Sequence, residues 1–272
     1  MFGKCFDNVR QICPLVHNIT NYVTVNDVAN VLLAAGASPV MSDGGDEKEI
    51  TAISSALNIN IGTLNKSTIR AMFRAGKTAN KLNRPVVLDP VGAGASALRT
   101  KTALKLIKNI KFSVIRGNIS EIKTLSLGNG KTRGVDAAAA DSVNDENLET
   151  GIKFVKEFAK SVQTVIAVTG KIDLVSDGEK TFVIRNGRAE MGKITGTGCQ
   201  LSSIIAAFIA ANKENALEAA AAAVCLMGTA GEIAWTKMLE GDGNSTYRNR
   251  IIDTICNMTG SELEKNAKYE IR

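Results

Sequence analysis

Several residue types that build common binding sites are scarce in this chain. His17 is the one histidine among 272 residues, which excludes a metal site built from several histidines. The five cysteines are odd in number and include no CxxC pair, so neither a disulfide framework nor a zinc site is expected. A reducing cytoplasm is the simplest location for such a chain.

Nucleic-acid and membrane partners are not expected either. Aromatic residues make up 4% of the chain, and its net charge of +6 comes from scattered lysines and arginines without a dense basic run. The longest apolar run, residues 219–230, is shorter than the roughly 18 residues that span a bilayer. It predicts a buried alanine-rich helix, and the charged N-terminus lacks the apolar core of a signal peptide.

What the chain does contain is a repeated alternation of strand and helix patterns, which we interpret as one domain over residues 1–272. This alternation predicts an α/β fold with a mostly parallel sheet and helices on both faces. The expected helices are 23–35, 66–82, 100–110, 119–125 and 145–161, and the expected strands are 85–88, 111–115, 164–168 and one within 52–61.

The pattern changes in the last third of the chain. Residues 172–176 and 181–185 predict a hairpin that turns at Asp177-Gly178. Two or three helices should follow to the C-terminus. Residues 127–141 form the least patterned segment, which we expect to be a surface loop.

The most informative segment is Gly196-Thr197-Gly198-Cys199, which an apolar helical pattern follows at once. Two glycines allow a tight turn, and a helix start directs free N–H groups and partial positive charge toward a bound anion. The same field should favour the thiolate of Cys199. These features point to phosphoryl transfer. The alternative is a helix start that Thr195 or Thr197 caps, with a buried cysteine.

Three expected strands end in polar residues, and in parallel sheets such ends converge on one edge. Asp89 follows the second strand, Arg116 and Glu121 follow the third, and Thr169 follows the fourth. The carboxylates suit Mg²⁺, and the arginine suits nucleotide phosphates. Taken singly, Asp89 could belong to a turn and Glu121 could be a first-turn helix charge.

Two common nucleotide-binding motifs are incomplete in this chain. Gly130-Lys131-Thr132 resembles the end of a P-loop, but Leu125 stands where its first glycine belongs. Leu201 likewise occupies the third glycine position of a dinucleotide fingerprint. ATP binding would therefore need a different structural solution.

The segment around His17 admits two interpretations. His17 itself is more simply explained as a satisfied structural group. Asn18, Thr20 and Asn21 precede a helix and are expected either to cap it or to contact a small molecule.

Together these segments resemble the hydroxyethylthiazole kinase family of the ribokinase-like superfamily. The resemblance rests on HNITNYVTVNDVAN (17–30), GASPVM (36–41), LDPVGAGAS (88–96), IRGNISEI (115–122), TGKIDLVSDG (169–178), GTGCQLSSIIAAF (196–208) and GDGNSTYR (241–248). It implies a three-layer α/β/α domain. It also implies transfer of the ATP γ-phosphate to the primary hydroxyl of 4-methyl-5-(2-hydroxyethyl)thiazole, a step of thiamine biosynthesis and salvage.

The resemblance also assigns roles to residues. Cys199 matches the catalytic base; Gly196, Thr197 and Gly198 match the anion hole; Asp89 and Glu121 match the Mg²⁺ network. The positions that match nucleotide contacts are Arg116, Asn118, Thr169 and Gly170, and those that match thiazole contacts are Met41, Gly196 and Asn21.

The family further implies a homotrimer whose thiazole pockets lie between subunits, so that Met41 would serve a neighbouring subunit. Three places depart from the family pattern: residues 42–45, Asp27 and Lys171. The first two lie near the expected thiazole pocket. Three alternatives follow: a kinase for another small alcohol, a non-catalytic thiazole-binding protein, or a related dehydratase, which should carry aspartate at position 199.

Overall fold

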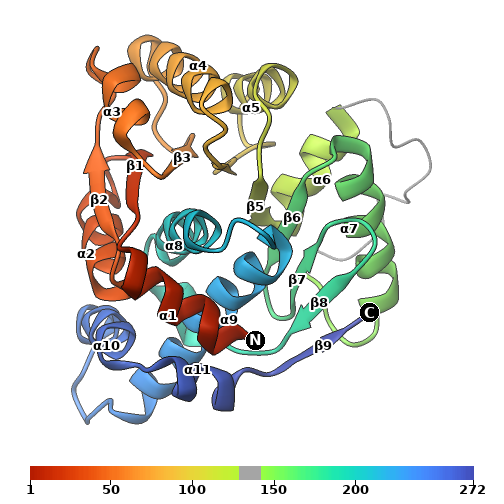
Figure 1. The fold of residues 1–272 in the computed structure, drawn as a ribbon. Coiled ribbons are helices and arrows are strands. Elements are labelled where there is room, and N and C mark those ends of the chain that lie inside the picture. The colour runs from red at the N-terminus through yellow and green to blue at the C-terminus, as the bar shows by residue number, and fades with distance from the viewer. Residues whose placement is uncertain (129–141) are drawn as a thin grey trace.

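The computed structural model describes residues 1–128 and 142–272, which form a three-layer α/β/α arrangement around a nine-stranded sheet (Figure 1). The strand order is β2-β1-β3-β4-β5-β6-β7-β8-β9. Most of the segment expected to be a surface loop, residues 127–141, lies outside the described residues.

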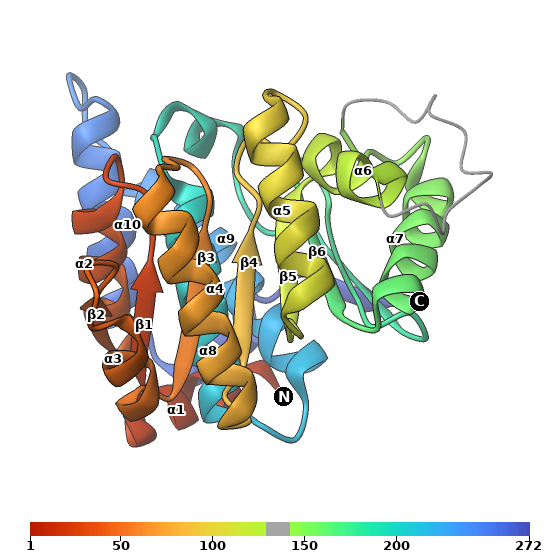
Figure 2. The same ribbon diagram turned by 90° about the horizontal axis from the view of Figure 1, so that it is seen from above.

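The first six strands in this order pair in parallel, and the last three pair antiparallel. The parallel strands are β1 (Leu15–Ile19), β2 (Ser38–Met41), β3 (Ala56–Asn60), β4 (Val86–Asp89), β5 (Val114–Asn118) and β6 (Val165–Thr169). The antiparallel extension consists of β7 (Asp173–Ser176), β8 (Thr181–Ile184) and β9 (Tyr269–Ile271). Figure 2 shows the parallel strands running toward one common edge.

Helices cover both faces of the curved sheet (Figure 1). The outer face carries α3 (Glu47–Ile53), α4 (Lys66–Lys81), α5 (Ala97–Asn109), α6 (Ile119–Gly128) and α7 (Leu148–Val162). Inside the curve lie α8 (Thr197–Ala211) and α9 (Ala216–Thr236), with α1 (Phe2–Ile12), α2 (Val25–Ala35), α10 (Asn244–Asn257) and α11 (Gly260–Asn266) packed around them. A 3₁₀ helix, Ala189–Lys193, precedes α8.

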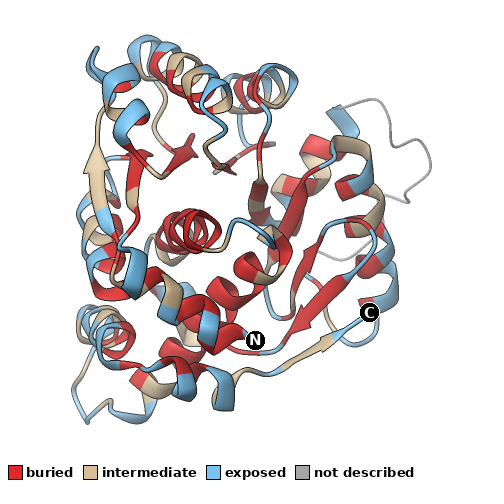
Figure 3. Ribbon diagram, in the orientation of Figure 1, coloured by how far each residue is buried: buried red, intermediate tan, exposed pale blue. Residues whose placement is uncertain are grey.

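The two central helices differ from the outer ones in their burial (Figure 3). In α8 every residue from Cys199 to Ala211 is buried, because the helix packs on four strands and on α1, α2 and α9. An outer helix such as α4 instead buries one stripe of small and apolar residues, and the Asn65 side chain caps its first turn. The helix that carries the Gly196–Cys199 turn is therefore the centre of the core.

The predicted alanine-rich helix is confirmed. α9 is long and apolar enough to cross a membrane, but 78% of its most apolar window is buried in the fold. Its apolar character is therefore that of a core helix.

The sequence interpretation missed several elements: α1, β1, β2, α3 and β9. Four α-helices, rather than two or three helices, follow the hairpin, in addition to the 3₁₀ helix. Asn18 is not a helix cap but lies within β1, and its buried side chain bonds to Asn58 and Ser203. The expected strand 111–115 instead spans Val114–Asn118.

Candidate active site

The turn before α8 adopts the geometry that its glycines allow. Gly196 has a φ of +84°, and a Cβ there would lie 2.2 Å from Cγ2 of Thr24. A Cβ on Gly198 would lie 2.3 Å from Nη1 of Arg116. Among the described residues no side chain caps this helix, contrary to the alternative that Thr195 or Thr197 does so. Its first N–H groups are thus available to an anion.

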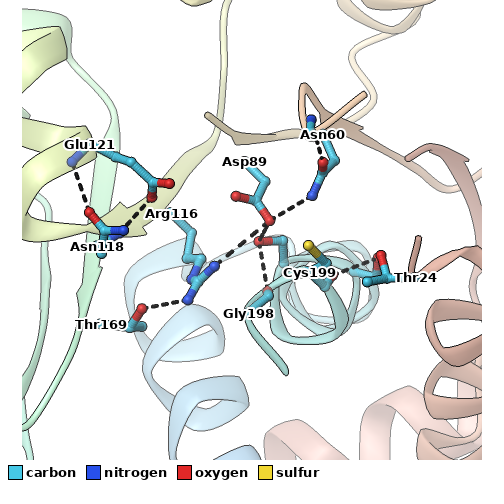
Figure 4. A network of polar contacts seen from close by, with 12 residues as sticks. Thr24, Asn60, Asp89, Arg116, Asn118, Glu121, Thr169, Gly198 and Cys199 are labelled. Carbon is cyan, nitrogen blue, oxygen red and sulfur yellow. Dashed lines mark hydrogen bonds and ion pairs between the residues drawn. The ribbon is translucent and has the colours of Figure 1, made fainter. Parts of the chain in front are cut away.

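Asp89 lies fully buried at the end of β4, facing this turn (Figure 4). Its Oδ2 accepts hydrogen bonds from Nδ2 of Asn60 at 2.9 Å and Oγ of Ser202 at 2.8 Å, and lies 3.7 Å from Nη1 of Arg116. Burial raises its pKa to about 6, although Arg116 opposes that shift. Its Oδ1 is buried and has no partner among the described residues, so it could accept a ligand.

Arg116 projects from β5 between Asp89 and the neighbouring strand β6 (Figure 4). Its Nη2 donates a hydrogen bond to Oγ1 of Thr169 at 2.5 Å, while its Nη1 faces Asp89. These contacts hold the guanidinium beside Gly198. A positive group is therefore fixed where the anion-binding turn opens.

Glu121 closes the same edge from the first turn of α6. Its two carboxylate oxygens accept from the backbone N–H of Gly92 at 2.8 Å and of Asn118 at 2.9 Å, while Oδ1 of Asn118 accepts from the N–H of Glu121 at 2.9 Å. This reciprocal bonding holds the carboxylate at the end of β5 and ties it to the loop after β4. Glu121 is therefore both an acidic residue in the first turn of α6 and a carboxylate at the candidate site.

Cys199 is 8% exposed, and its sulfur accepts a hydrogen bond from Nδ2 of Asn21 at 3.2 Å. The same Asn21 amide also donates to Oδ1 of Asn60 at 3.1 Å, and Asn60 donates to Asp89. A chain of buried amides thus joins the thiol to the carboxylate. The expected stabilisation of the thiolate is wrong, because burial and then Asp89 raise the pKa of the Cys199 thiol.

Asn60 and Ser202 are the site residues that the sequence interpretation missed. Asn60 ends β3, so the same strand-end argument that selected Asp89 would have found it. Ser202 lies four residues after Gly198, one helical turn along α8, and this spacing places both on one face. Their shared partner, Asp89, could not be inferred from spacing.

A cavity of about 750 Å³ opens beside this network. The four predicted nucleotide contacts line it together with the turn before α8: Arg116, Asn118, Thr169, Gly170, Thr197 and Gly198. Asp173, another lining residue, accepts from the N–H of Gly170 at 2.8 Å, and burial raises its pKa to about 7. The cavity's volume is that of a small-molecule site.

Met41 lies apart from this cavity, at the end of the edge strand β2, where it is half-buried. The loop after it is held by His17, whose Nε2 lies 2.7 Å from the Ser42 carbonyl oxygen and whose Nδ1 lies 2.8 Å from Oγ1 of Thr51. Burial lowers the pKa of His17. The structural role predicted for His17 is confirmed.

Comparisons with known proteins show the family of this chain. The model of the Hydroxyethylthiazole kinase family matches residues 6–261. A hydroxyethylthiazole kinase of Clostridium acetobutylicum is 56% identical over 271 residues, 99% of each chain.

Two solved structures have a similar fold. That of the hydroxyethylthiazole kinase protein from Pyrococcus horikoshii OT3 superposes with a TM-score of 0.89 at 34% identity, covering 100% of this chain and 98% of that one. The pyridoxal kinase from Staphylococcus aureus in complex with ADP shares the fold at 14% identity, with a TM-score of 0.61 and coverage of 95% and 97%.

Proposed function

This chain belongs to the hydroxyethylthiazole kinase family, and from that premise we propose how its residues divide the work of phosphoryl transfer. Its activity is the family's: it is a phosphotransferase of thiamine biosynthesis. The acceptor is the primary hydroxyl of 4-methyl-5-(2-hydroxyethyl)thiazole, and ATP is the donor. The observation that carries the assignment of roles is the meeting of the Gly196–Cys199 turn, Arg116 and Asp89 beside the cavity of about 750 Å³.

Charge neutralisation falls to the turn and to Arg116. The transferring phosphoryl group passes through a loose transition state, so fixed positive charge and positioning contribute most to the rate. The free N–H groups at the start of α8 would hold the phosphoryl oxygens. Arg116, fixed by Thr169 and Asp89, would bind the nucleotide phosphates, with Asn118 and Gly170 nearby in the same cavity.

Mg²⁺ fits the carboxylates at this edge of the sheet. Asp89 offers a buried oxygen that no described residue bonds, and Glu121 presents a second carboxylate nearby in the network. Within the described ranges no group of three or more His, Cys, Asp or Glu side chains could enclose a metal ion. We therefore propose that Asp89 and Glu121 hold the ion with its waters and the nucleotide, where it would neutralise phosphate charge.

Cys199 and Asn21 would act on the acceptor. Asn21 borders the turn and holds the sulfur of Cys199, so both side chains can meet the substrate hydroxyl. We propose that Cys199 receives the hydroxyl proton as transfer proceeds. Only the thiolate form of Cys199 can accept this proton, and because the pKa of the thiol is raised, that form is a minor fraction at neutral pH. A loose transition state makes little demand on the base, so this fraction suffices, and the thiol formed returns the proton to solvent after transfer.

We further propose that the enzyme is a homotrimer in which Met41 contacts the thiazole of a neighbouring subunit. Exposed apolar residues occur on the elements next to β2 in the chain: Leu33 of α2, which packs on β2, is 59% exposed, Ile53 at the end of α3 is 68% exposed, and Tyr22 in the turn before α2 is 79% exposed. Such residues at a sheet edge suit an interface between subunits.

The reaction is tested by measuring ADP formation from ATP and Mg²⁺ with and without the thiazole alcohol, with detection of the product by mass. Thiazole-dependent ADP and thiazole phosphate are expected in equal amounts. If another heterocyclic alcohol stimulates ADP formation more strongly than the thiazole does, that alcohol, and not the thiazole, is the preferred acceptor. Saturable thiazole binding with no phosphate transfer would contradict catalysis.

A further inference from the structure

A second polar cavity lies at the edge of the sheet opposite the candidate active site. It has a volume of about 280 Å³ and is bounded by the residues that precede β4 and β5 and by the connection from α8 to α9. We call it the amino-edge cavity. The residues that matter for its chemistry are Arg84, Lys111, Ser113, Lys213 and Ala216.

The charge of the amino-edge cavity is of one sign. Arg84, Lys111 and Lys213 line it, and no carboxylate of the described part of the chain does. Within residues 1–128 and 142–272 none of the three makes an ion pair. Arg84 is half-buried and the two lysines are exposed, so an anion in the cavity would meet three positive side chains that solvent can reach.

Arg84 supplies a second, independent observation. Its Nε is buried and has no hydrogen-bond partner among the described residues, although a buried donor without a partner destabilises a fold. The backbone of Lys111 is fixed nearby, since its N–H and carbonyl both bond to the side chain of Asn80 at 2.7 and 2.8 Å. An anion in the cavity would accept the hydrogen bond that Arg84 lacks.

The two helix ends at the cavity carry partial charges of opposite sign. The 21-residue helix α9 begins at Ala216, so its partial positive charge lies at the cavity wall. The C-terminal end of α8 is also close and would favour a cation at Lys213. The partial negative charge at the end of α8 explains the cation at Lys213. It does not explain Arg84 or Lys111, which lie in the segments just before β4 and β5.

A larger cleft of about 580 Å³ adjoins the amino-edge cavity, since Arg84 and Lys213 line both. Ile12, Ala210 and Ala211 give it an apolar wall, and the carboxylates Glu214 and Glu218 also face it. It therefore offers room for an organic group beside the cationic cavity.

From these features we infer that the amino-edge cavity binds the phosphate group of a phosphate ester or diphosphate, at a site separate from the nucleotide cavity. A phosphate group carries several negatively charged acceptor oxygens, so it can accept hydrogen bonds from Arg84 and from both lysines at once. The helix α8, about 22 Å long at 1.5 Å per residue, separates this cavity from Cys199.

Calorimetric titration of inorganic pyrophosphate tests the inference. It is done on wild type and two double variants, each without and with saturating ADP and Mg²⁺ to fill the nucleotide cavity. K111Q/K213Q removes two cations from the amino-edge cavity, and K101Q/K105Q removes two exposed lysines of α5 with the same change in charge. Pyrophosphate should bind ADP-loaded wild type and K101Q/K105Q equally, and bind K111Q/K213Q at least tenfold more weakly.

Equal pyrophosphate affinity in the two double variants, or no binding to ADP-loaded wild type, would overturn the inference. ADP affinity is titrated separately and should be the same in all three proteins. If none of the three proteins binds ADP, the proposed nucleotide site is contradicted. The titrations of pyrophosphate without ADP would then still compare the two double variants and test the amino-edge cavity. Repeating the titration with phenyl phosphate and with inorganic phosphate tests whether the ligand is a phosphate ester. An ester whose organic group occupies the adjoining cleft should bind more tightly than inorganic phosphate.

Discussion

The chemistry of Cys199 depends on its depth in the fold as much as on its place at a helix start. Burial and the Asp89 carboxylate raise the pKa of the thiol, so little thiolate forms at pH 7. If the thiolate is the base, wild-type kcat should rise as pH increases from about 7 to about 9.

Substitution Cys199→Ala should lower kcat by about 10- to 100-fold and flatten this rise, while KM for ATP changes by less than about twofold. Steady-state kinetics across pH measure both effects. The same upward slope in wild type and variant would show that another group takes the proton.

Asn60 links the two halves of the site, because its amide donates to Asp89 and accepts from Asn21. Substitution Asn60→Ala should lower kcat at least tenfold and reduce the free energy of unfolding by about 1–3 kcal/mol, since buried partners lose hydrogen bonds. Asn65→Ala is the matched control. It removes the cap of α4 and should cost about 1 kcal/mol without reducing kcat. Equal kcat in the two variants would leave Asn60 a purely structural role.

Asp173 should make stability depend on pH. Its folded-state pKa is raised from 3.8 to about 7, so its contribution is fully present at low pH and is lost as pH rises through 7. Substitution Asp173→Asn keeps an oxygen to accept from Gly170 but cannot ionise. The unfolding free energy of the variant relative to wild type should therefore increase by about 1–3 kcal/mol between about pH 4 and pH 8. Denaturation at both pH values measures this change, and a difference independent of pH would contradict it.

At the scale of elements, the turn before α8 has little tolerance for a side chain. Substitution Gly196→Ala places a Cβ against Thr24 at a positive φ and should cost about 1–3 kcal/mol of unfolding free energy, with at least a tenfold loss of kcat. Gly44→Ala is the control for stability, because a Cβ there meets nothing within 4 Å at an ordinary φ. Similar thermal unfolding of both variants would show that the turn is more adaptable than its geometry suggests.

The elements that the sequence predicted are those with a clear period or a long apolar run. The helices α2, α4, α5 and the hairpin β7–β8 follow their patterns closely. β1 and β2 do not, because β1 buries the polar His17 and Asn18 against partners from α3, β3 and α8, while β2 is a short edge strand that contains Pro39. A polar residue in a buried strand is explained only by its partners, which come from elsewhere in the chain.

The same limit applies to the candidate site. Strand ends and the glycine turn suffice to predict that Asp89, Arg116, Thr169 and Gly198 meet at one edge. They cannot predict the bonding of Asn60 and Ser202 to one carboxylate oxygen, nor the direction of the pKa shift at Cys199. Both depend on burial and on distances between segments that are remote in sequence.

At the scale of the whole molecule, the apolar surface beside β2 bears on assembly. If it forms the interface of a trimer, Ile53→Lys should shift the protein from three times the 28.8 kDa chain mass toward the monomer and lower activity at low concentration. Leu239→Lys is the control, because Leu239 is 70% exposed and lies after α9, on another part of the chain. Sedimentation velocity measures the masses. A monomeric wild type, or equal dissociation by both variants, would contradict the proposed interface.

The burial of α8 has a consequence for how this enzyme can change through evolution or redesign. Since the helix that carries the reactive turn is enclosed by four strands and three helices, residues that hold the phosphoryl group cannot be adjusted without repacking the core. The edge strand β2 and the loop after Met41 lie outside this core, because within the chain they are only partly buried. New acceptor alcohols should therefore be gained at the rim of the sheet, while the apparatus for phosphoryl transfer stays fixed.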